Sequence, residues 1–300
     1  MKKILPAALC GVLAVAGCTD MQETPMPTVD GEKALDYVRE FVQLGPRVSD
    51  TEGARRAARY LRDRAEELGW EVSVDTWSED TDNGRMTFRN VHAVLPGKGE
   101  DFVLLGSHYD TKHLPEIPEF VGANDSGSST GLLLALMEVL AENPPSHTIE
   151  CVFFDGEESR VRYTSGDGLH GSRRHVKKLI AENRLERCRA LLLMDMVGDR
   201  DLKVAFPPSS SSKLVGQAFE IAERQGVRQH FGYRTQGDIL DDHIPFAKQG
   251  VSVINFIDFE FGPNNSYWHT KHDTLDRLSP KSLQIVGNVV FELAYRLAER

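Results

Sequence analysis

The sequence predicts an α/β fold of three layers, in which a mixed but mostly parallel sheet is covered by helices on both faces. Two observations carry this prediction. Short apolar segments alternate along the chain with longer segments of helical periodicity, a pattern typical of βαβ units. Several expected strands, such as 101–110 and 189–198, are almost continuously apolar. Strands of that kind are buried on both faces, as in parallel sheets.

The pattern places six helices and six strands. The expected helices are 31–45, 50–69, 127–142, 171–184, 213–226 and 279–299, and the expected strands are 70–77, 86–97, 101–110, 148–155, 189–198 and 251–258. Asp50 and Thr51 are candidate N-caps of the second helix. Because ligands gather beyond the carboxyl ends of parallel strands, functional residues are expected directly after the strands.

The amino-terminal segment has the form of an export signal. Lys2 and Lys3 precede an apolar run that is shorter than the roughly 20 residues of a membrane-spanning helix, and Ala-Gly-Cys follows. This ending resembles the lipobox of bacterial lipoproteins. Residues 1–17 are therefore expected to be a lipoprotein signal peptide and Cys18 the lipidated residue. An ordinary secretory signal, with Cys18 incidental, is the alternative.

The remaining chain is expected to be one exported domain on a lipid anchor. Residues 18–31, which include Pro25 and Pro27, are expected to be a flexible tether, and residues 32–300 a single catalytic domain. The anchor would hold this domain on the periplasmic or cell-surface side of a bacterial membrane. Cys151 and Cys188 would then remain, either paired in an oxidising compartment or as two buried free thiols.

Composition limits the class of partner. The chain has 300 residues, 40% of them hydrophobic, and can bury a substantial core. Its net charge of −10, without a long basic patch, excludes a nucleic-acid partner because the phosphate backbone would be repelled. Small molecules, peptides and proteins remain as ligands.

Carboxylates and histidines follow the expected strands in succession. They are His108, Asp110, Asp125, Asp155, Glu157, Glu158, Asp195, Asp199, His269, His272 and Asp273. A single carboxylate at a strand end is usually a cap or a surface charge. Several carboxylates together with histidines, at the exits of one sheet, are instead suitable ligands for zinc, which accepts imidazole nitrogen and carboxylate oxygen.

Spacing adds detail at two of these exits. In His108-x-Asp110, strand alternation puts both side chains on one face, so Asp110 could accept the second ring N–H of His108 and fix its tautomer. Glu157 and Glu158 are adjacent, so their side chains should diverge. One carboxylate could then hold a metal while the other carries a proton.

These motifs, taken in order, resemble the zinc-dependent M28 peptidase family. The resemblance rests on His-x-Asp, "GANDS", the Glu-Glu pair, an apolar strand ending in Asp and a late His-Thr, and it covers the chain from about Ala34 onward. It implies the metal ligands His108, Asp125, Glu158, Asp195 and His269. Asp125 would bridge if two zinc ions were bound, and Glu157 would be the general base.

A narrower resemblance points to one branch of that family. The long segment between Glu158 and Gly171, together with "FFDGEE", "HYDTK", "DDHIPF" and "WHT", is similar to glutaminyl-peptide cyclotransferases. This similarity implies one zinc held by Asp125, Glu158 and His269, with His108 and Asp195 as candidates for a second ion or for supporting contacts. It implies that Glu157 shuttles a proton, assisted by Asp195 and Asp242, and that Trp268 lines the glutamine pocket. Tyr163 stands where the animal enzymes have a tryptophan, and is expected to contact substrate.

Three functions follow from these resemblances. The expected one converts the N-terminal glutamine of peptides or proteins to pyroglutamate with release of ammonia. The alternative is a zinc aminopeptidase. The segment "GANDSGSSTG" favours it, because this segment resembles the corresponding motif of the peptidases more than that of the cyclotransferases. A third is a non-catalytic binding lipoprotein on the same fold. One zinc is expected in the enzyme, and two are possible.

Overall fold

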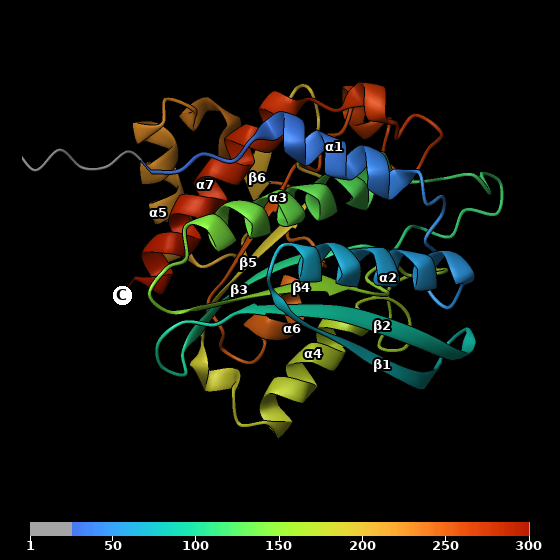
Figure 1. Cartoon of the computed structure of the whole chain (residues 1–300). Coiled ribbons are helices and arrows are strands. Elements are labelled where there is room, and N and C mark those ends of the chain that lie inside the picture. Colours follow the sequence, from blue (N-terminus) through green and yellow to red (C-terminus); the bar gives the residue numbers. More distant parts are fainter. Residues whose placement is uncertain (1–25, 300) are drawn as a thin grey trace, which may run out of the picture.

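A six-stranded sheet forms the centre of the molecule, with the strand order β1-β2-β4-β3-β5-β8 (Figure 1). The computed structural model describes residues 26–299. Its main strands are β1 (Glu71–Thr81), β2 (Gly84–Leu95), β3 (Phe102–His108), β4 (Thr148–Phe154), β5 (Cys188–Asp195) and β8 (Val253–Ile257). Strands β4, β3, β5 and β8 are parallel to one another, whereas β1 and β2 form an antiparallel hairpin and β2 pairs antiparallel with β4. The predicted mixed, mostly parallel sheet is confirmed.

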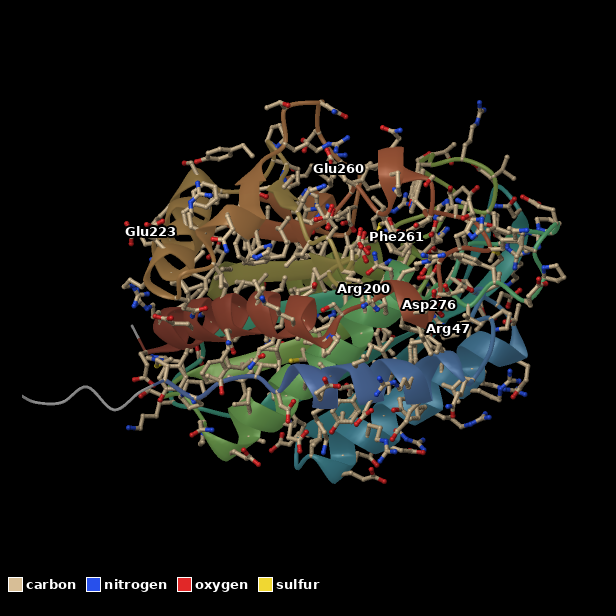
Figure 2. The ribbon with its side chains drawn as sticks, turned by 90° about the horizontal axis from the view of Figure 1, so that it is seen from above. Arg47, Arg200, Glu223, Glu260, Phe261 and Asp276 are labelled. Atoms are coloured by element: carbon tan, nitrogen blue, oxygen red, sulfur yellow. The ribbon has the colours of Figure 1, made fainter. Side chains whose placement is uncertain are left out.

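Helices cover both faces of this sheet, as predicted. One face carries α1 (Gly31–Val42), α2 (Glu52–Glu67), α3 (Ser129–Glu142), α5 (Ser212–Arg224) and α7 (Pro280–Ala298), and the other carries α4 (His170–Ala181) and α6 (His243–Ala247). Figure 2 looks onto the first of these layers, with α1, α3 and α7 side by side. Two separate apolar clusters fill the spaces above and below the sheet.

The helices begin where polar side chains can accept their free N–H groups. Asp30 accepts the backbone N–H groups of Glu32 and Lys33 at the start of α1. Thr51 accepts the N–H of Ala54 at the start of α2, and it is therefore the N-cap of that helix. The other candidate, Asp50, has a positive φ of 63° and accepts an N–H from strand β2 instead.

The segment before α1 is attached to the domain. Val29 is buried, and its N–H donates to Asn288 Oδ1 at 2.8 Å. Gly287 on α7 makes this contact possible, because a Cβ there would meet the Val29 side chain at about 3 Å. The end of the expected tether is thus packed against α7. Residues 1–17 and Cys18 lie outside the described residues.

No helix in the described range 26–299 combines the length and apolar character needed to span a bilayer.

Short elements escaped the sequence analysis. Strands β6 (Val204–Phe206) and β7 (Phe231–Tyr233) form a separate parallel pair, and α6 has only five residues. Single 3₁₀ turns occur at Leu185–Arg187, Arg228–His230, Pro263–Asn265 and Leu275–Arg277, and Ala123–Ser128 forms an irregular helical turn before α3. Segments this short complete too little of a period to be recognised in a sequence.

The two cysteines left open by the sequence are free thiols. Both are buried. Cys151 on β4 belongs to the apolar cluster on the α3 side of the sheet, and Cys188 on β5 belongs to the cluster on the α4 side. Strand β3 lies between their strands. With their side chains on opposite faces, these two cysteines cannot form a disulfide.

Candidate active site

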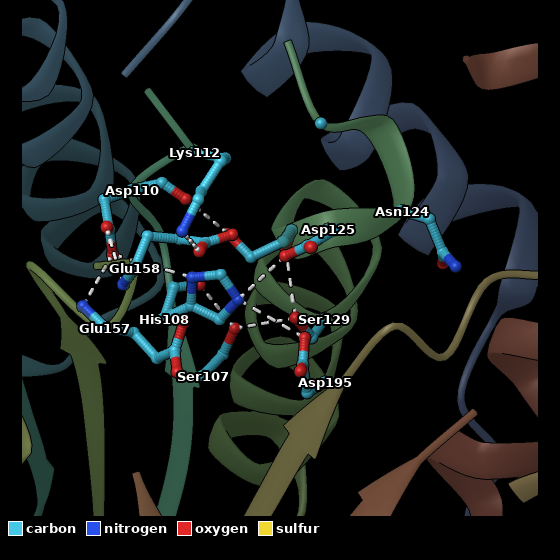
Figure 3. A network of polar contacts seen from close by, with 12 residues as sticks. Ser107, His108, Asp110, Lys112, Asn124, Asp125, Ser129, Glu157, Glu158 and Asp195 are labelled. Atoms are coloured by element: carbon cyan, nitrogen blue, oxygen red, sulfur yellow. Dashed lines mark hydrogen bonds and ion pairs between the residues drawn. The ribbon is translucent and has the colours of Figure 1, made fainter. Parts of the chain in front are cut away.

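The site lies beyond the carboxyl ends of the parallel strands, as predicted. His108 is the last residue of β3, and its Nε2 lies 3.2 Å from Asp125 Oδ1 and 3.3 Å from Asp195 Oδ1 (Figure 3). Its Nδ1 faces Asp110 Oδ1 at 3.5 Å, which is an ion-pair distance and longer than a normal hydrogen bond. His108 therefore joins three carboxylates from three different segments.

Asp110 also forms two backbone hydrogen bonds that the sequence analysis did not predict. Its Oδ1 accepts the backbone N–H of Glu157 at 3.1 Å, and its Oδ2 accepts the N–H of Glu158 at 3.2 Å. The end of β3 thus holds the turn that follows β4. Figure 3 shows Asp110 beside the backbone of the two glutamates. Asp110 fixes the position of the Glu-Glu pair as well as facing the imidazole of His108.

The two glutamates diverge, as their adjacency predicted. Glu158 Oε1 lies 2.8 Å from His269 Nε2, and Glu158 Oε2 lies 3.3 Å from Lys112 Nζ. Glu157 points elsewhere, toward Tyr163, whose hydroxyl lies 2.9 Å and 3.1 Å from its two carboxylate oxygens. The Glu158 carboxylate therefore lies among the potential metal ligands, which we call the metal-type cluster. The Glu157 carboxylate instead accepts a hydrogen bond from the loop that follows the pair.

Asp125 occupies the centre of the cluster. Its Oδ1 faces His108, and its Oδ2 lies 3.1 Å from His269 Nε2. Trp268 Nε1 also donates to Asp125 Oδ2, at 3.0 Å. The backbone is held by Asp273, whose carboxylate accepts the N–H groups of Asn124 at 2.6 Å and of Asp125 at 3.1 Å. With one histidine at each oxygen, Asp125 has the placement of a bridging carboxylate.

Two groups of potential metal ligands result, and they share Asp125. The first is Asp125, Glu158 and His269, and the second is His108, Asp125 and Asp195. In each group the ligand-type atoms lie within 4.8 Å of one another. The structure therefore brings together all five residues that the family resemblance implied as ligands, although they come from five separate segments of the chain.

The cluster perturbs the pKa values of its members. Burial by itself would raise the pKa of Asp125, but hydrogen bonds from His108 and His269 lower it far below the ordinary value. Burial would likewise lower the pKa of His269, yet the carboxylates of Glu158 and Asp125 raise it to about 10. Carboxylate and imidazole thus stabilise each other's charges. Bound cations compete for the same carboxylates.

Glu157 has the opposite character. Burial is the main reason that its pKa lies well above the ordinary value for a glutamate, and the carboxylates of Glu158 and Asp241 raise it further, whereas His108 opposes them. Burial also raises the pKa of Tyr163, so its hydroxyl keeps its proton and can donate to Glu157. A carboxyl group with an elevated pKa can take up and release a proton near neutral pH.

Trp268, Tyr163, Glu157 and Asp195 line one cavity of about 220 Å³. Its lining residues come from strand ends and loops at the carboxyl edge of the sheet: Asp125, Glu157, Glu158, Tyr163, Asp195, Arg234, Asp238, Ile239, Leu240, Asp241, Ile257, Phe259, Trp268 and His269. Trp268 is stacked on His269 with 4.0 Å between ring centroids, and its other neighbour is Phe259 at 4.9 Å. An aromatic wall therefore stands directly beside the metal-type cluster.

Asp242 and Asp241 differ in position. Asp242 is fully buried, and it does not line the cavity. Asp241 does line it, accepts a hydrogen bond from Asn255 Nδ2 at 2.7 Å, and has a pKa raised to about 6 by burial and by Asp195. The proton-transfer role of Asp242 stays a prediction. Asp241 is a neighbour that the sequence analysis did not single out, although "DDHIPF" contains both residues.

Arg47 was also missed. It is completely buried, and its guanidinium donates to the carbonyl oxygens of Tyr109 and Val121, each at 2.8 Å. Burial lowers the pKa of Arg47 to about 10, while Asp110 and Asp273 support its charge. It joins the segment after β3 to the segment before Asp125. An arginine in the loop after a helix carries no sequence signal for such a role.

A third group of ligand-type residues lies apart from the cavity. It consists of His92 on β2, Glu150 on β4 and His175 on α4, all buried. His92 Nε2 lies 2.8 Å from one oxygen of Glu150, and Arg184 pairs with the other oxygen. Because His92 and Arg184 already occupy the two oxygens of this carboxylate, we interpret the group as a structural Arg184–Glu150 ion pair beneath α4.

Comparison with known proteins agrees with this geometry. The sequence profile described as peptidase family M28 matches residues 90–294, so the chain belongs to that family. Within the family it falls in the branch that resembles glutaminyl cyclases. Glutaminyl-peptide cyclotransferase of Drosophila melanogaster is 27% identical over 343 residues, which cover 99% of this chain and 95% of the relative.

Solved structures lead to the same branch. The crystal structure of an Acidobacteriales bacterium glutaminyl cyclase has a TM-score of 0.87 and 31% identity, and the match covers 95% of this chain and 100% of that one. A Zn-dependent exopeptidase from Parabacteroides distasonis shares the fold, with a TM-score of 0.81, 24% identity, and coverage of 90% and 99%. The same fold therefore occurs in a protein named a glutaminyl cyclase and in one named a Zn-dependent exopeptidase.

Proposed function

We propose that this protein is a zinc-dependent glutaminyl-peptide cyclotransferase, which closes the N-terminal glutamine of a peptide to pyroglutamate. The observation that carries the proposal is the contact between Tyr163 and Glu157. Both residues line the cavity of about 220 Å³, together with Trp268. A space of this size suits one glutamine side chain beside a proton carrier.

The residues fit a zinc ion. Asp125, Glu158 and His269 offer two carboxylate oxygens and one imidazole nitrogen, a donor set that zinc accepts. Glu158 Oε2 is buried and has no hydrogen-bond partner among the described residues, although the Lys112 ammonium forms an ion pair with it at 3.3 Å. All three residues line the cavity, so a zinc ion that they held would be accessible to a substrate there. We propose one catalytic zinc here, because His108 of the other group does not line the cavity.

Bound zinc would act as a Lewis acid toward the γ-carbonyl of the glutamine. Glu157 would take a proton from the α-amine, and the amine nitrogen would then attack the γ-carbon to form the lactam bond. As the bond from the γ-carbon to the amide nitrogen breaks, Glu157 would return the proton to that nitrogen, which leaves as ammonia. Tyr163 would hold the Glu157 carboxylate in place, and Trp268 would orient the side chain.

Two peptides test the proposal against the aminopeptidase alternative. The purified domain is incubated with a peptide that begins with glutamine and with one that begins with leucine. Loss of one ammonia from the first, seen by mass spectrometry, supports cyclisation. Release of free leucine from the second, without change in the first, would establish the aminopeptidase instead.

The aminopeptidase remains the second candidate for a specific reason. Asp125 stands between His108 and His269 in the geometry of a bridging ligand, and two-metal sites of this type serve metal-assisted hydrolysis. In that reaction Glu157 would activate a water molecule. A non-catalytic binding protein is the third candidate, and absence of zinc from the purified domain would favour it.

Export and lipid anchoring complete the proposal. The support is the sequence alone: two lysines, an apolar run and the Ala-Gly-Cys ending at Cys18. The anchored enzyme would act on peptide or protein N-termini outside the cytoplasmic membrane. Labelling cells with a fatty-acid analogue should mark the wild-type chain and leave Cys18→Ser unlabelled. Equal labelling of both would refute the anchor.

A further inference from the structure

A second cavity adjoins the active-site cavity. It has a volume of about 500 Å³ and lies on the face of the sheet that carries α4 and α6, which pack against each other (Figure 1). Tyr163 and Leu240 line both cavities. We call the second cavity the α4–α6 groove. A chain that leaves the active site past Tyr163 and Leu240 would enter this groove directly.

The walls of the groove are largely apolar. Leu169, Val176, Ile244 and Pro245 contribute to them, together with Ile180 and Leu240. Ile180 and Leu240 are each 47% exposed, and both are among the few large apolar side chains that the described part of the chain leaves in solvent. Exposed apolar surface that is concentrated in a concave site is typical of ligand binding.

The charged residues of the groove are all cations. They are Arg173 and Lys177 on α4 and Lys248 just after α6, and no aspartate or glutamate lines the groove. Lys177 and Lys248 form no ion pair with any other residue in the range 26–299. Arg173 donates to the carbonyl oxygens of Leu169 and Ser165 and so fixes one wall.

The neighbouring active-site cavity has the opposite charge. Six carboxylates line it, and its basic lining residues are Arg234 and His269. The carboxylates are Asp125, Glu157, Glu158, Asp195, Asp238 and Asp241. A free N-terminal amine is attracted to such a cavity, whereas acidic groups further along the same peptide would be repelled by it and attracted to the lysines of the groove.

We propose that the α4–α6 groove is a subsite for the residues that directly follow the N-terminal glutamine, and that it selects peptides with acidic and apolar side chains there. The inference rests on the proposed cyclotransferase function, whose reacting atoms lie in the adjoining cavity. The groove orients the peptide by charge: its amine end enters the acidic cavity, and its acidic segment lies along α4.

The test measures kcat/KM for amidated Gln-Ala, for the amidated pentapeptide Gln-Ala-Ala-Leu-Ala, and for a set of pentapeptides in which glutamate or lysine replaces one residue after the glutamine at each position in turn. A glutamate at one or two positions should raise kcat/KM over the neutral pentapeptide about three- to tenfold, the effect of one or two partly exposed ion pairs. The gain should appear in KM and shrink as salt is added.

Charge-removing variants locate the effect. In Lys177→Ala/Lys248→Ala, the ratio of kcat/KM for the best acidic pentapeptide to that for Gln-Ala amide should fall to the ratio for the neutral pentapeptide. Lys213→Ala is the matched control, because Lys213 is an exposed helical lysine on α5 that does not line the groove. Lys177→Glu/Lys248→Glu should favour the lysine-containing peptides instead.

The two proposals fail in different ways. Cyclisation of Gln-Ala amide with no charge preference at any position would overturn the subsite and leave the cyclotransferase intact. If no glutamine peptide were cyclised, binding of a fluorescent acidic peptide to the wild type and to the double alanine variant would still test the groove. Equal affinity for both proteins would overturn it, and weaker binding by the variant would support it.

Discussion

The hydroxyl of Tyr163 lies 2.9 Å and 3.1 Å from the two carboxylate oxygens of Glu157. Tyr163, in the long loop after the Glu-Glu pair, therefore donates its hydroxyl proton to this carboxylate. Burial raises the pKa of Tyr163, which keeps this hydroxyl protonated. Burial also raises the pKa of Glu157. The hydrogen bond acts against that second shift, because it stabilises the ionised carboxylate.

Removing this hydroxyl should therefore change the pH dependence of turnover. In Tyr163→Phe the ionised form of Glu157 loses a donor, so its pKa should rise further. The acidic limb of the kcat/KM profile should move to higher pH by roughly half a unit to one unit, which matches a hydrogen bond of about 1 kcal/mol. Tyr163→Trp keeps an N–H donor and should shift the limb less. An unchanged limb in Tyr163→Phe would show that the contact does not influence Glu157.

The neighbouring glutamates should respond differently to the same substitution. Glu157→Gln should keep zinc and lose turnover, because Glu157 faces Tyr163 and not the ligand-type atoms of His269. Glu158→Gln should lose zinc, because Glu158 Oε1 faces His269 at 2.8 Å. Metal analysis of both purified variants and their turnover of a glutamine peptide are the measurements. Retention of metal and activity by both would mean that the site is assigned wrongly.

Much of this arrangement could be predicted from the sequence. The six strands of the main sheet have recognisable patterns of apolar residues, and the polar residues that follow them can be identified in the sequence. Adjacency alone predicts that Glu157 and Glu158 diverge. The order of strands in the sheet, by contrast, depends on tertiary packing, and this order is what brings Asp195 to His108.

The supporting contacts could not be predicted in this way. Asp110 holds the backbone N–H groups of residues 157 and 158, which are 47 and 48 positions away. Arg47 donates to the carbonyl groups of Tyr109 and Val121, at the two ends of the loop after β3. The lining of the cavity by Asp241 in place of Asp242 depends on how one short helix sits, and a five-residue helix leaves no periodic pattern. A side chain that bonds to a backbone group does not constrain which residue carries that group. Such contacts therefore produce no recognisable sequence motif.

The carboxylate of Asp273 should strengthen zinc binding although it does not line the cavity. It accepts the N–H groups of Asn124 and Asp125, at 2.6 Å and 3.1 Å. Asp273→Ala would leave two buried donors without partners and release the backbone of a proposed ligand. We expect a loss of roughly 2 to 4 kcal/mol in the free energy of unfolding, and zinc affinity about 10- to 100-fold weaker.

Asp273→Asn separates these two effects. Its side-chain oxygen can still accept one of the two N–H groups, so both losses should be smaller than in the alanine variant. Zinc affinity is measured by competition with a chelator, and stability by denaturant unfolding in excess zinc. Wild-type zinc affinity in Asp273→Ala would contradict the positioning role.

Stability should fall as pH rises through 6, in part because of Asp258. This carboxyl follows β8, is fully buried, and accepts the N–H groups of Lys203 at 2.7 Å and of Glu260 at 3.1 Å. Burial is the main cause that raises its pKa from 3.8 to about 6, and Asp199 adds to it. Because the folded pKa lies above the unfolded one, the contribution to stability is complete below pH 3.8 and is lost through pH 6.

Asp258→Asn isolates this contribution. The amide does not titrate and retains one acceptor, so the variant should be less stable at pH 5 but should lose less stability between pH 5 and pH 8. Between pH 5 and pH 8 the wild type should lose roughly 1 to 2 kcal/mol more of its free energy of unfolding than Asp258→Asn. Urea unfolding at several pH values measures it, and the subtraction removes the other buried carboxyls, which titrate equally in both proteins. Parallel curves for the wild type and Asp258→Asn would show that Asp258 is ionised throughout this range.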